Sequence, residues 1–346
     1  MLDQFPNAFR QRANMTERGK MKNSNVLVVG ATHFIGSHLI ERLVSLGSQV
    51  KAFIQYDYHN DQGALKHLPV YIQNKIEVIS GDLTNPEAIE YATSGVEVIY
   101  HLGTVDIIPY LHINLRDLLE ANVIGTFNVL NAAKKYKVQK LVYISTGDVY
   151  GNVEHAPIDE IQPLSALSPQ IATYIGAEKL VEGYHLSEGI PVVITRLFNL
   201  YGPTQSKKAI IPTIIAQALI EPKLYLGNMH AIRDFIYVED VVDGLIKAAE
   251  IPESVGETIN LGSGQGISVG DLAEKILMLI DRDIEILFDA TRIRPQSHDI
   301  EQLVADITKA NELLDWQPST SLDGGLQHTI DWFSEHLDMG QIVRRS

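Results

Sequence analysis

A glycine-containing turn near the amino terminus has the residue types that bind a pyrophosphate. Gly30 and Gly36 frame the run GATHFIG, which follows the apolar segment VLVV and precedes an amphipathic one. Glycines allow a tight turn and let backbone N–H groups approach phosphate oxygens at the start of a helix. Asp57 lies about 20 residues further on, the usual spacing for a carboxylate on the adenosine ribose, and no arginine stands nearby to meet a 2′-phosphate. The turn predicts NAD rather than NADP; the alternative is a strand–helix turn that binds no nucleotide.

Basic residues gather at a few places in an otherwise acidic chain, whose formal net charge is −15. These places are Arg196, Lys207 with Lys208, Arg233, and Arg292 with Arg294. A planar guanidinium group suits phosphate oxygens, so we interpret them as local selection of a small anion. The alternative is that they are solvated surface charges. The net charge argues against a broad nucleic-acid surface.

The composition excludes several kinds of chemistry. The 346 residues include no cysteine, so no disulfide, thiolate metal site or cysteine nucleophile is expected, and any redox chemistry must come from a cofactor. We predict no metal site. The first 23 residues are polar, and no later window approaches the ~20 apolar residues of a membrane span. We therefore expect a cytoplasmic protein that has no membrane segment and carries a polar extension over residues 1–23.

Short apolar runs alternate with amphipathic stretches from Val26 onward, as expected for a parallel sheet covered on both faces. Gly47 and Pro86 are ordinary signals for a helix end and a helix start. The pattern predicts an α/β fold, a Rossmann-type doubly wound parallel sheet over residues 24–190, with late strands from about 191–200 and 235–262. A smaller α/β domain, mainly residues 200–338, is expected to bind the substrate.

Further motifs follow from Val26 to about Trp332. They include GDL at 81–83, HLG at 101–103 and N-x-x-G-T at 122–126. Together with the glycine turn, they resemble motifs of the nucleotide-sugar epimerases and dehydratases of the extended short-chain dehydrogenase family. The resemblance implies that NAD is bound by Gly30, His33, Phe34, Ile35, Gly36, Asp57, Asp82, Leu83, Leu102, Gly103, Asn122 and Ser145.

One cofactor position departs from the family pattern. His33 stands where G-x-x-G-x-x-G has its middle glycine, which in the family makes room for the pyrophosphate. Two readings stay open. The imidazole either weakens cofactor binding or points away from the cofactor without effect.

The catalytic positions depart further. The family uses a Ser or Thr, a Tyr, and a Lys four residues later, because Tyr and Lys then share a helix face and the ammonium lowers the pKa of the phenol. The run 145–151 resembles S-[ST]-x-x-V-Y-G, which places Thr146 at the hydroxyl position. Where dehydratases of the family commonly have Asp and Glu, this chain has Gly147 and Asp148, so one carboxylate is missing.

The Tyr–Lys pair itself is replaced. The run 168–178 aligns with S-P-Y-x-x-S-K-x-x-x-E, which puts Gln170 at the Tyr position and Tyr174 at the Lys position. Lys179 follows Tyr174 by five residues and lies well round the helix. Glutamine is neither a general acid nor a general base, so oxidation at the sugar C4 should be crippled. Tyr174 is either a displaced acid or a packed aromatic residue.

The substrate side keeps more of the family pattern. R-x-x-N-x-Y-G-P at 196–203 and R-D-F-I-Y-V-E-D at 233–240 resemble motifs whose polar groups contact the substrate diphosphate. Resemblance to bacterial NAD-dependent 4,6-dehydratases of UDP-N-acetylglucosamine-type sugars favours a UDP-sugar as the nucleotide-diphospho-sugar. The implied substrate-binding residues are Asn199, Ile211, Arg233, Arg292 and Arg294.

Relatives pair two helices per subunit, so a homodimer is expected through residues 117–136 and 170–186. The apolar residues in helical spacing there are Leu118, Leu119, Val123, Ile171, Ile175 and Leu180. Two functional hypotheses remain. The first is an NAD-dependent epimerase or dehydratase with altered catalytic residues. The second is a catalytically inactive relative that senses NAD or a nucleotide-sugar, or supports a partner subunit.

Overall fold

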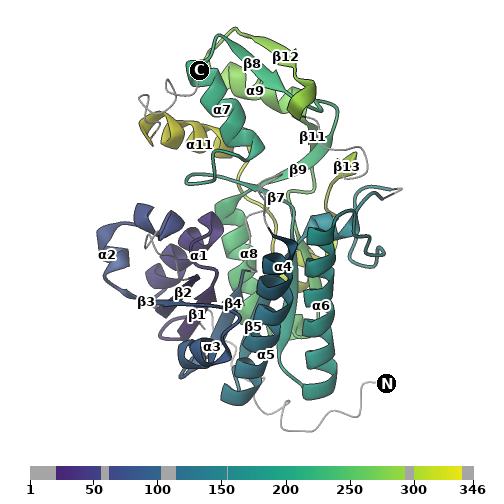
Figure 1. The fold of residues 1–346 in the computed structure, drawn as a ribbon. Helices are drawn as coiled ribbons and strands as arrows, with labels where there is room; N and C mark the ends of the chain where they lie inside the picture. Colours follow the sequence, from purple (N-terminus) through teal and green to yellow (C-terminus); the bar gives the residue numbers. More distant parts are fainter. Residues whose placement is uncertain (1–20, 56–61, 103–113, 154, 293–299, 337–346) are drawn as a thin grey trace.

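A seven-stranded parallel sheet lies at the centre of the amino-terminal part (Figure 1). The computed structural model describes residues 21–55, 62–102, 114–153, 155–292 and 300–336. The sheet order is β3 (Ile76–Gly81), β2 (Gln49–Gln55), β1 (Asn25–Val29), β4 (Val98–His101), β5 (Lys140–Thr146), β6 (Val192–Leu197) and β10 (Thr258–Leu261). The order reverses between β1 and β4, which is where doubly wound sheets bind their ligands.

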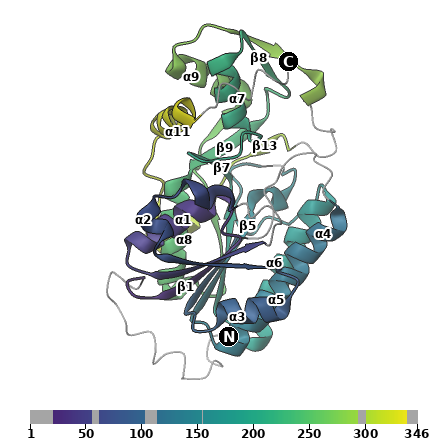
Figure 2. The same ribbon diagram turned by 60° about the vertical axis from the view of Figure 1, so that its left-hand side comes forward.

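Helices cover both faces of this sheet, as Figure 2 shows. On one face α1 (Phe34–Ser45) packs against α8 (Val238–Glu250); on the other α5 (Gly125–Tyr136) lies between α3 (Pro86–Thr93) and α6 (Pro169–Glu188). Alternate residues of β1 enter two different apolar clusters, Val26 and Val28 on one side, Leu27 and Val29 on the other. Strands buried on both faces have near-continuous apolar sequences. The predicted Rossmann-type α/β fold is confirmed.

The helix signals in the sequence act as expected. Asn85 caps α3 by accepting from two backbone N–H groups, and Pro86 takes the first helical position. Beyond α1, Gly47 has a φ of +93°, a left-handed conformation that favours glycine. Ser168 caps α6 by accepting from the N–H of Ile171, and Gly189 ends the helix. These caps fix where the helices begin relative to the strand ends.

The segment expected as one helix from about 117 to 136 contains a break. It consists of α4 (Leu115–Leu119), the π-helical turn η3 (Glu120–Ile124) and α5. At this turn Asn122 is buried and its Nδ2 donates to Thr173 Oγ1 of α6 at 2.8 Å. A π turn shifts the helix face by one residue. The packing of Asn122 against α6 is therefore a tertiary effect that the apolar spacing did not reveal.

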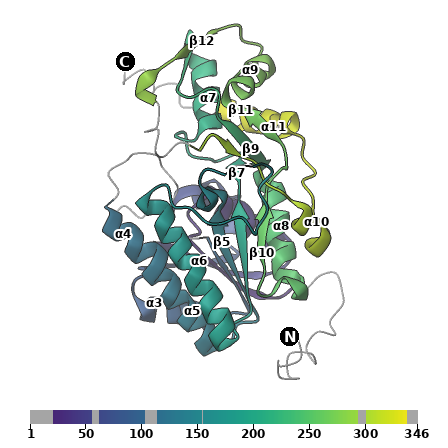
Figure 3. The same cartoon turned by 90° about the vertical axis from the view of Figure 1, so that its right-hand side faces the viewer.

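A smaller carboxy-terminal lobe lies beyond the strand ends (Figure 3). Its sheet strands are β7 (Asn199–Tyr201), β9 (Ile232–Tyr237), β11 (Gly266–Ser268) and β13 (Gln302–Leu303), and a separate parallel pair is β8 (Lys223–Leu226) with β12 (Glu285–Phe288). Its helices are α7 (Ile210–Ile220), α9 (Val269–Ile280) and α11 (Leu322–His336); α10 (Thr308–Leu314) packs on α8 and β10 instead. The short elements are η2 (Gly63–His67), α2 (Val70–Gln73), η4 (Gly147–Tyr150), η5 (Pro252–Ser254) and η6 (Ala290–Arg292). In the described part of the chain, no helix is both long and apolar enough to cross a membrane.

Candidate active site

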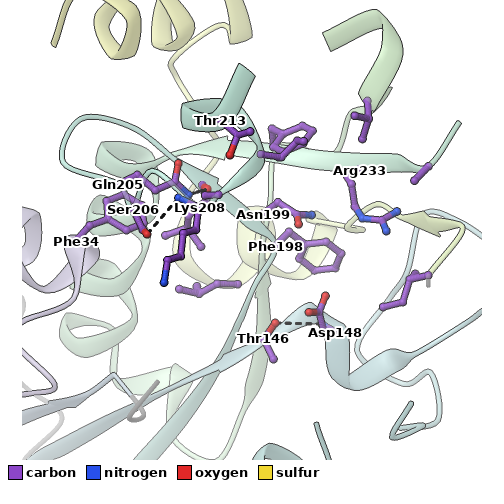
Figure 4. A pocket seen from close by; sticks show the side chains of 18 of the residues that line it. Phe34, Thr146, Asp148, Phe198, Asn199, Gln205, Ser206, Lys208, Thr213 and Arg233 are labelled. Carbon is purple, nitrogen blue, oxygen red and sulfur yellow. Dashed lines mark hydrogen bonds between the residues drawn. The ribbon is translucent and has the colours of Figure 1, made fainter. Parts of the chain in front are cut away.

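A cleft of about 510 Å³ lies between the carboxyl ends of the central strands and the carboxy-terminal lobe (Figure 4). Leu102 follows β4, Ser145 and Thr146 end β5, and Leu197 ends β6, and all four line the cleft. The opposite wall comes from the lobe and includes Arg233 of β9. Ligands of open α/β sheets bind in this crevice outside the strand ends.

The structure brings about half of the expected site residues together. Those that line the cleft are His33, Phe34, Leu102, Ser145, Thr146, Asp148, Tyr174, Asn199, Arg233 and Arg292. The described residues that do not line it are Gly30, Ile35, Gly36, Asp82, Leu83, Asn122, Gln170 and Ile211. Asp57, Gly103 and Arg294 lie outside the described residues.

The glycine turn has the geometry expected for a phosphate-binding loop at two of its positions. Gly30 has a φ of +82°, and a Cβ at Gly36 would lie 2.8 Å from the carbonyl oxygen of Ala31, too close for any side chain. His33 is different, because its φ of −65° and ψ of 152° suit any residue. The backbone therefore accepts histidine here without strain, and the residue lines the cleft at the start of α1.

Three other cofactor candidates occupy the strand ends. Asp82 follows β3, and its Oδ1 accepts from the backbone N–H and the hydroxyl of Thr84, both at 2.8 Å. Leu83 is buried, and a Cβ at Gly125 would lie 3.0 Å from it, so the two elements pack closely. Ser145 Oγ is buried with no hydrogen-bond partner among the described residues. It is a donor at the cleft wall that a ligand could satisfy.

The reacting positions differ in how they face the cleft. Thr146 accepts a hydrogen bond from Asp148 N–H at 3.2 Å and so caps η4. Tyr174 is 5% exposed and lines the cleft. Gln170 does not line it; its carbonyl oxygen accepts from Thr173 Oγ1 at 2.7 Å, and its buried Nε2 has no partner within the described part.

Arg196 does not belong to the anion-binding groups, which corrects the interpretation from the sequence. It is 3% exposed and forms a bidentate pair with Glu178 of α6, with N···O distances of 2.7 and 3.1 Å. Burial alone would lower the pKa of Arg196, but hydrogen bonds and charge from Glu178 raise it above its ordinary value. The pair joins α6 to β6 within the protein interior.

The lobe wall supplies cationic and amide groups. Asn199 Nδ2 donates to the carbonyl oxygen of Asp234 at 3.3 Å, and Arg233 Nη1 donates to the carbonyl of Ile232 at 2.9 Å. The buried carboxylate of Asp234 accepts from three backbone N–H groups, those of Ser263, Gly264 and Ala305, and so holds β9 in place. Burial raises the pKa of Asp234, and these donors partly offset the rise.

Several cleft residues were not assigned a role from the sequence. They are Phe198, Gln205, Ser206, Tyr225 and Asn228. The strand β8 reads KLYL with Leu224 and Leu226 buried and Tyr225 exposed, so its alternation was a usable signal. For the loop residues there was no periodic signal, because their position depends on the tertiary fold.

Known proteins share both the sequence and the fold. The chain is 30% identical over 325 residues to a trifunctional UDP-glucose 4,6-dehydratase/3,5-epimerase/reductase of Arabidopsis thaliana, covering 91% of this chain and 48% of that protein. It is 31% identical to UDP-glucuronic acid decarboxylase 2 of the same plant, covering 92% and 70%. The chain thus spans about half the length of the first relative.

Solved structures of similar proteins have the same fold. UDP-glucuronic acid 4-epimerase from Bacillus cereus, in complex with UDP-glucuronic acid and NAD, is 28% identical with a TM-score of 0.80, covering 90% of this chain and 99% of that one. The dTDP-glucose 4,6-dehydratase of Bacillus anthracis, in complex with NAD, is 27% identical with a TM-score of 0.78, covering 90% and 97%. The family model described as GDP-mannose 4,6-dehydratase matches residues 27–329. With the sheet order, the strand-end cleft and this match over most of its length, the chain belongs to the GDP-mannose 4,6-dehydratase-like family of extended short-chain dehydrogenases.

Proposed function

We propose that this chain binds NAD and a nucleotide-diphospho-sugar in the strand-end cleft and performs an altered epimerase or dehydratase reaction there. The observation that carries the proposal is the composition of the cleft. One wall has the start of α1 and the ends of β4 and β5; the other has Lys208, Arg233 and Arg292. The start of a helix beside strand ends suits the pyrophosphate of a dinucleotide, and a cationic wall suits a diphosphate ester.

The residues of the first wall fit NAD, together with Gly30 and Asp82, which lie outside the cleft lining. Gly30 and the start of α1 would hold the pyrophosphate, Asp82 the adenine, and Ser145 a polar group near the reacting end. When bound, NAD supplies a hydride acceptor. His33 stands at the position where the family has glycine, and it lines the cleft.

The second wall fits a nucleotide-diphospho-sugar, with a UDP-sugar favoured. Asn199 and Arg233 lie on adjacent strands and would bind the diphosphate, and Lys208 and Arg292 line the same cleft. The sugar ring would then lie near Thr146 and Asp148. This arrangement leaves proton transfer to groups other than the missing Tyr–Lys pair.

A binder without catalysis is the second candidate, and the position of Gln170 outside the cleft lining favours it. The test is to incubate the purified protein with NAD and a panel of UDP-, GDP- and dTDP-sugars and to follow products by mass spectrometry. Conversion of one sugar supports the enzyme. Binding by calorimetry without any conversion favours the inactive relative, and absence of both NAD and sugar binding rejects the proposal.

The proposed assembly is a homodimer formed by the outer face of α4, η3 and α5 together with α6. Leu119, Ile124 and Phe127 are exposed on this face. Of the residues expected there, Leu118 and Ile171 are instead buried in their own subunit. Leu119 was expected on this face, whereas Ile124 and Phe127 were not.

A further inference from the structure

The centre of the cleft has groups suited to taking a proton from carbon, although it lacks the pair that takes one from a hydroxyl. An alcohol can give up a hydride only when its hydroxyl proton leaves as well. Gln170 cannot accept that proton and does not line the cleft. Thr146, Asp148 and Tyr174 do line it. The three supply two hydroxyl groups and one carboxylate.

A sugar that already contains a ketone has no hydroxyl proton to lose at that carbon. The hydrogen on the neighbouring carbon is acidified by the carbonyl, so one carboxylate can remove it when hydrogen-bond donors stabilise the oxygen that becomes negative. A general base and oxyanion donors are therefore sufficient. The described cleft residues supply both kinds of group.

Asp148 is placed for the role of base. It lies in η4, directly after β5, and Figure 4 shows its carboxylate pointing into the cleft on the side of Phe198 and Asn199. Its N–H donates to Thr146 Oγ1 at 3.2 Å, which fixes the turn. Because the hydroxyl oxygen of Thr146 is the acceptor in that bond, its hydrogen can be donated to another oxygen.

The glycine before Asp148 shapes the same spot. A Cβ at Gly147 would lie 3.3 Å from the ring of Phe198, which is tighter than an ordinary contact. Glycine thus lets the aromatic ring close against η4, where a carboxylate side chain at 147 would not fit without moving it. An apolar ring beside Asp148 excludes water on one side, which strengthens hydrogen bonds formed there.

We propose that the cleft takes a nucleotide-diphospho-sugar already oxidised to a ketone, and that Asp148 removes the hydrogen next to the carbonyl. This rests on the proposed function, because the nucleotide-sugar must first bind. The C–H bond breaks, its electron pair forms a carbon–carbon double bond, and the carbonyl π pair moves to oxygen. The proton passes to Asp148, while the hydroxyls of Thr146 and Tyr174 donate to the enolate oxygen.

Return of the proton to the carbon restores the ketone with its configuration kept or inverted. No hydride moves in this step and no oxidant is consumed. The reaction that supplies the substrate must therefore be one that oxidises a sugar hydroxyl to a ketone. That oxidation is the step for which this chain lacks the Tyr–Lys pair.

The test is solvent exchange. The protein with NAD is incubated in D₂O with UDP-4-keto-6-deoxyglucose and, in parallel, with UDP-glucose, and deuterium uptake is followed by mass spectrometry and by proton NMR. We expect uptake beside the carbonyl of the keto-sugar, above the rate without protein, and none into UDP-glucose. Asp148→Asn should lower the rate by about 10² to 10⁴-fold. The matched control Asp283→Asn, at an exposed site outside the cleft, should leave it unchanged.

Keto-sugar binding by calorimetry with exchange no faster than without protein would overturn the inference and leave the proposed function standing. An Asp148→Asn variant that exchanges like wild type would overturn it as well. If neither UDP-glucose nor the keto-sugar binds, the proposed function itself fails. Should Asp148→Asn not fold, the pH profile of wild-type exchange decides. The rate must fall on acidification, because only the carboxylate accepts a proton.

Discussion

Gln170 and Tyr174 are the residues that most separate this chain from the family pattern. If the remaining site is intact, only the proton-transfer pair for alcohol oxidation is absent, and such catalysis is typically worth about 10² to 10⁴ in rate. The double change Gln170→Tyr with Tyr174→Lys should raise NAD reduction by a suitable nucleotide-sugar by roughly that factor. Either single change should do little, because the phenol needs its cationic neighbour. The measurement is nicotinamide absorbance over time.

Two outcomes of that experiment count against the expectation. If the double variant binds NAD and the nucleotide-sugar but stays inert, the site is not a damaged oxidising centre. If wild type is active on alcohols and Tyr174→Phe abolishes this activity, Tyr174 is itself the acid. Tyr174→Phe tests the hydroxyl alone, because it keeps the buried ring.

His33 gives a second prediction at the scale of one residue. It lines the cleft while its backbone has ordinary extended angles, so His33→Gly should leave the turn unstrained. We expect His33→Gly to bind NAD more tightly in calorimetry on stripped protein, because the pyrophosphate gains room. His230→Gly, at an exposed position outside the cleft, is the control. Equal NAD affinity in wild type and His33→Gly would mean that the imidazole points away.

The sequence could indicate which residues belong to the site but not which of them face it. Thr146, Asp148 and Tyr174 were found by motif spacing and do line the cleft. Arg196 was found by the same means, yet it pairs with Glu178 inside the protein. An arginine that binds an anion and one that binds a buried carboxylate have the same local sequence signal. The partner comes from α6, and only the tertiary structure brings it near.

Helices and strands could be predicted where burial sets the pattern of apolar residues in the sequence. The strands β1 and β5 were expected from apolar runs, and α3 begins at the expected signal Pro86. The π turn at Glu120–Ile124 was not expected, because it accompanies a tertiary contact, the hydrogen bond from Asn122 to Thr173. The order of the strands in the sheet depends on where each crossover connection places the next strand. The alternation of strands and helices in the sequence indicates the fold class but not this order.

His101, at the end of β4, gives a prediction about how the stability of the protein changes with pH. His101 is fully buried, and its Nε2 lies 2.9 Å from Thr126 Oγ1 of α5. Burial lowers the pKa of His101 to about 4, from 6.5. The unfolded chain therefore binds more protons between these values, so stability rises with pH in this window and is lost as the pH falls through it. The loss should be on the order of 3 kcal/mol between pH 6.5 and pH 4.

Denaturant unfolding at several pH values measures this loss. The variant His101→Gln keeps a polar group near Thr126 and should show a flatter pH dependence than wild type. His230→Gln, which removes an exposed histidine, should leave the dependence unchanged. His38 is buried as well and its lowered pKa acts in the same direction, so some dependence should persist in His101→Gln. If stability changed with pH equally steeply in wild type and in His101→Gln, the pH dependence could not be due to His101.

At the scale of the whole molecule, the cleft depends on two parts of the chain that are far apart in sequence. Asp148 comes from the sheet, whereas Arg233 and Arg292 come from the lobe. Ile158 of the connecting segment bridges to Ala305, and Asp234 holds the backbone of Ser263 and Ala305. The geometry of the cleft is therefore a property of both parts together, so neither set of motifs alone indicates the substrate.

The outer helices also suggest how the molecule assembles. Leu119 of α4 is 50% exposed, and Ile124 of η3 and Phe127 of α5 are exposed as well; Phe127 packs edge-on against Tyr184 of α6. An apolar face of this kind beside α6 is typical of an interface between helices. Light scattering at micromolar concentration should therefore return about twice the chain mass of 38.4 kDa. Leu119→Arg combined with Ile124→Arg should give the mass of one chain, because two charges would be buried without partners.

Ile161→Arg is the matched control for that experiment, since Ile161 is 88% exposed and lies outside these helices. It should leave the mass unchanged. The double arginine variant should keep its far-ultraviolet circular dichroism, because both positions are already exposed in one subunit and do not stabilise its core. A wild-type mass near 38.4 kDa would reject the dimer. A dimer that survives both arginines would place the interface elsewhere on the molecule, and the apolar side chains of α4 and α5 would then need another partner.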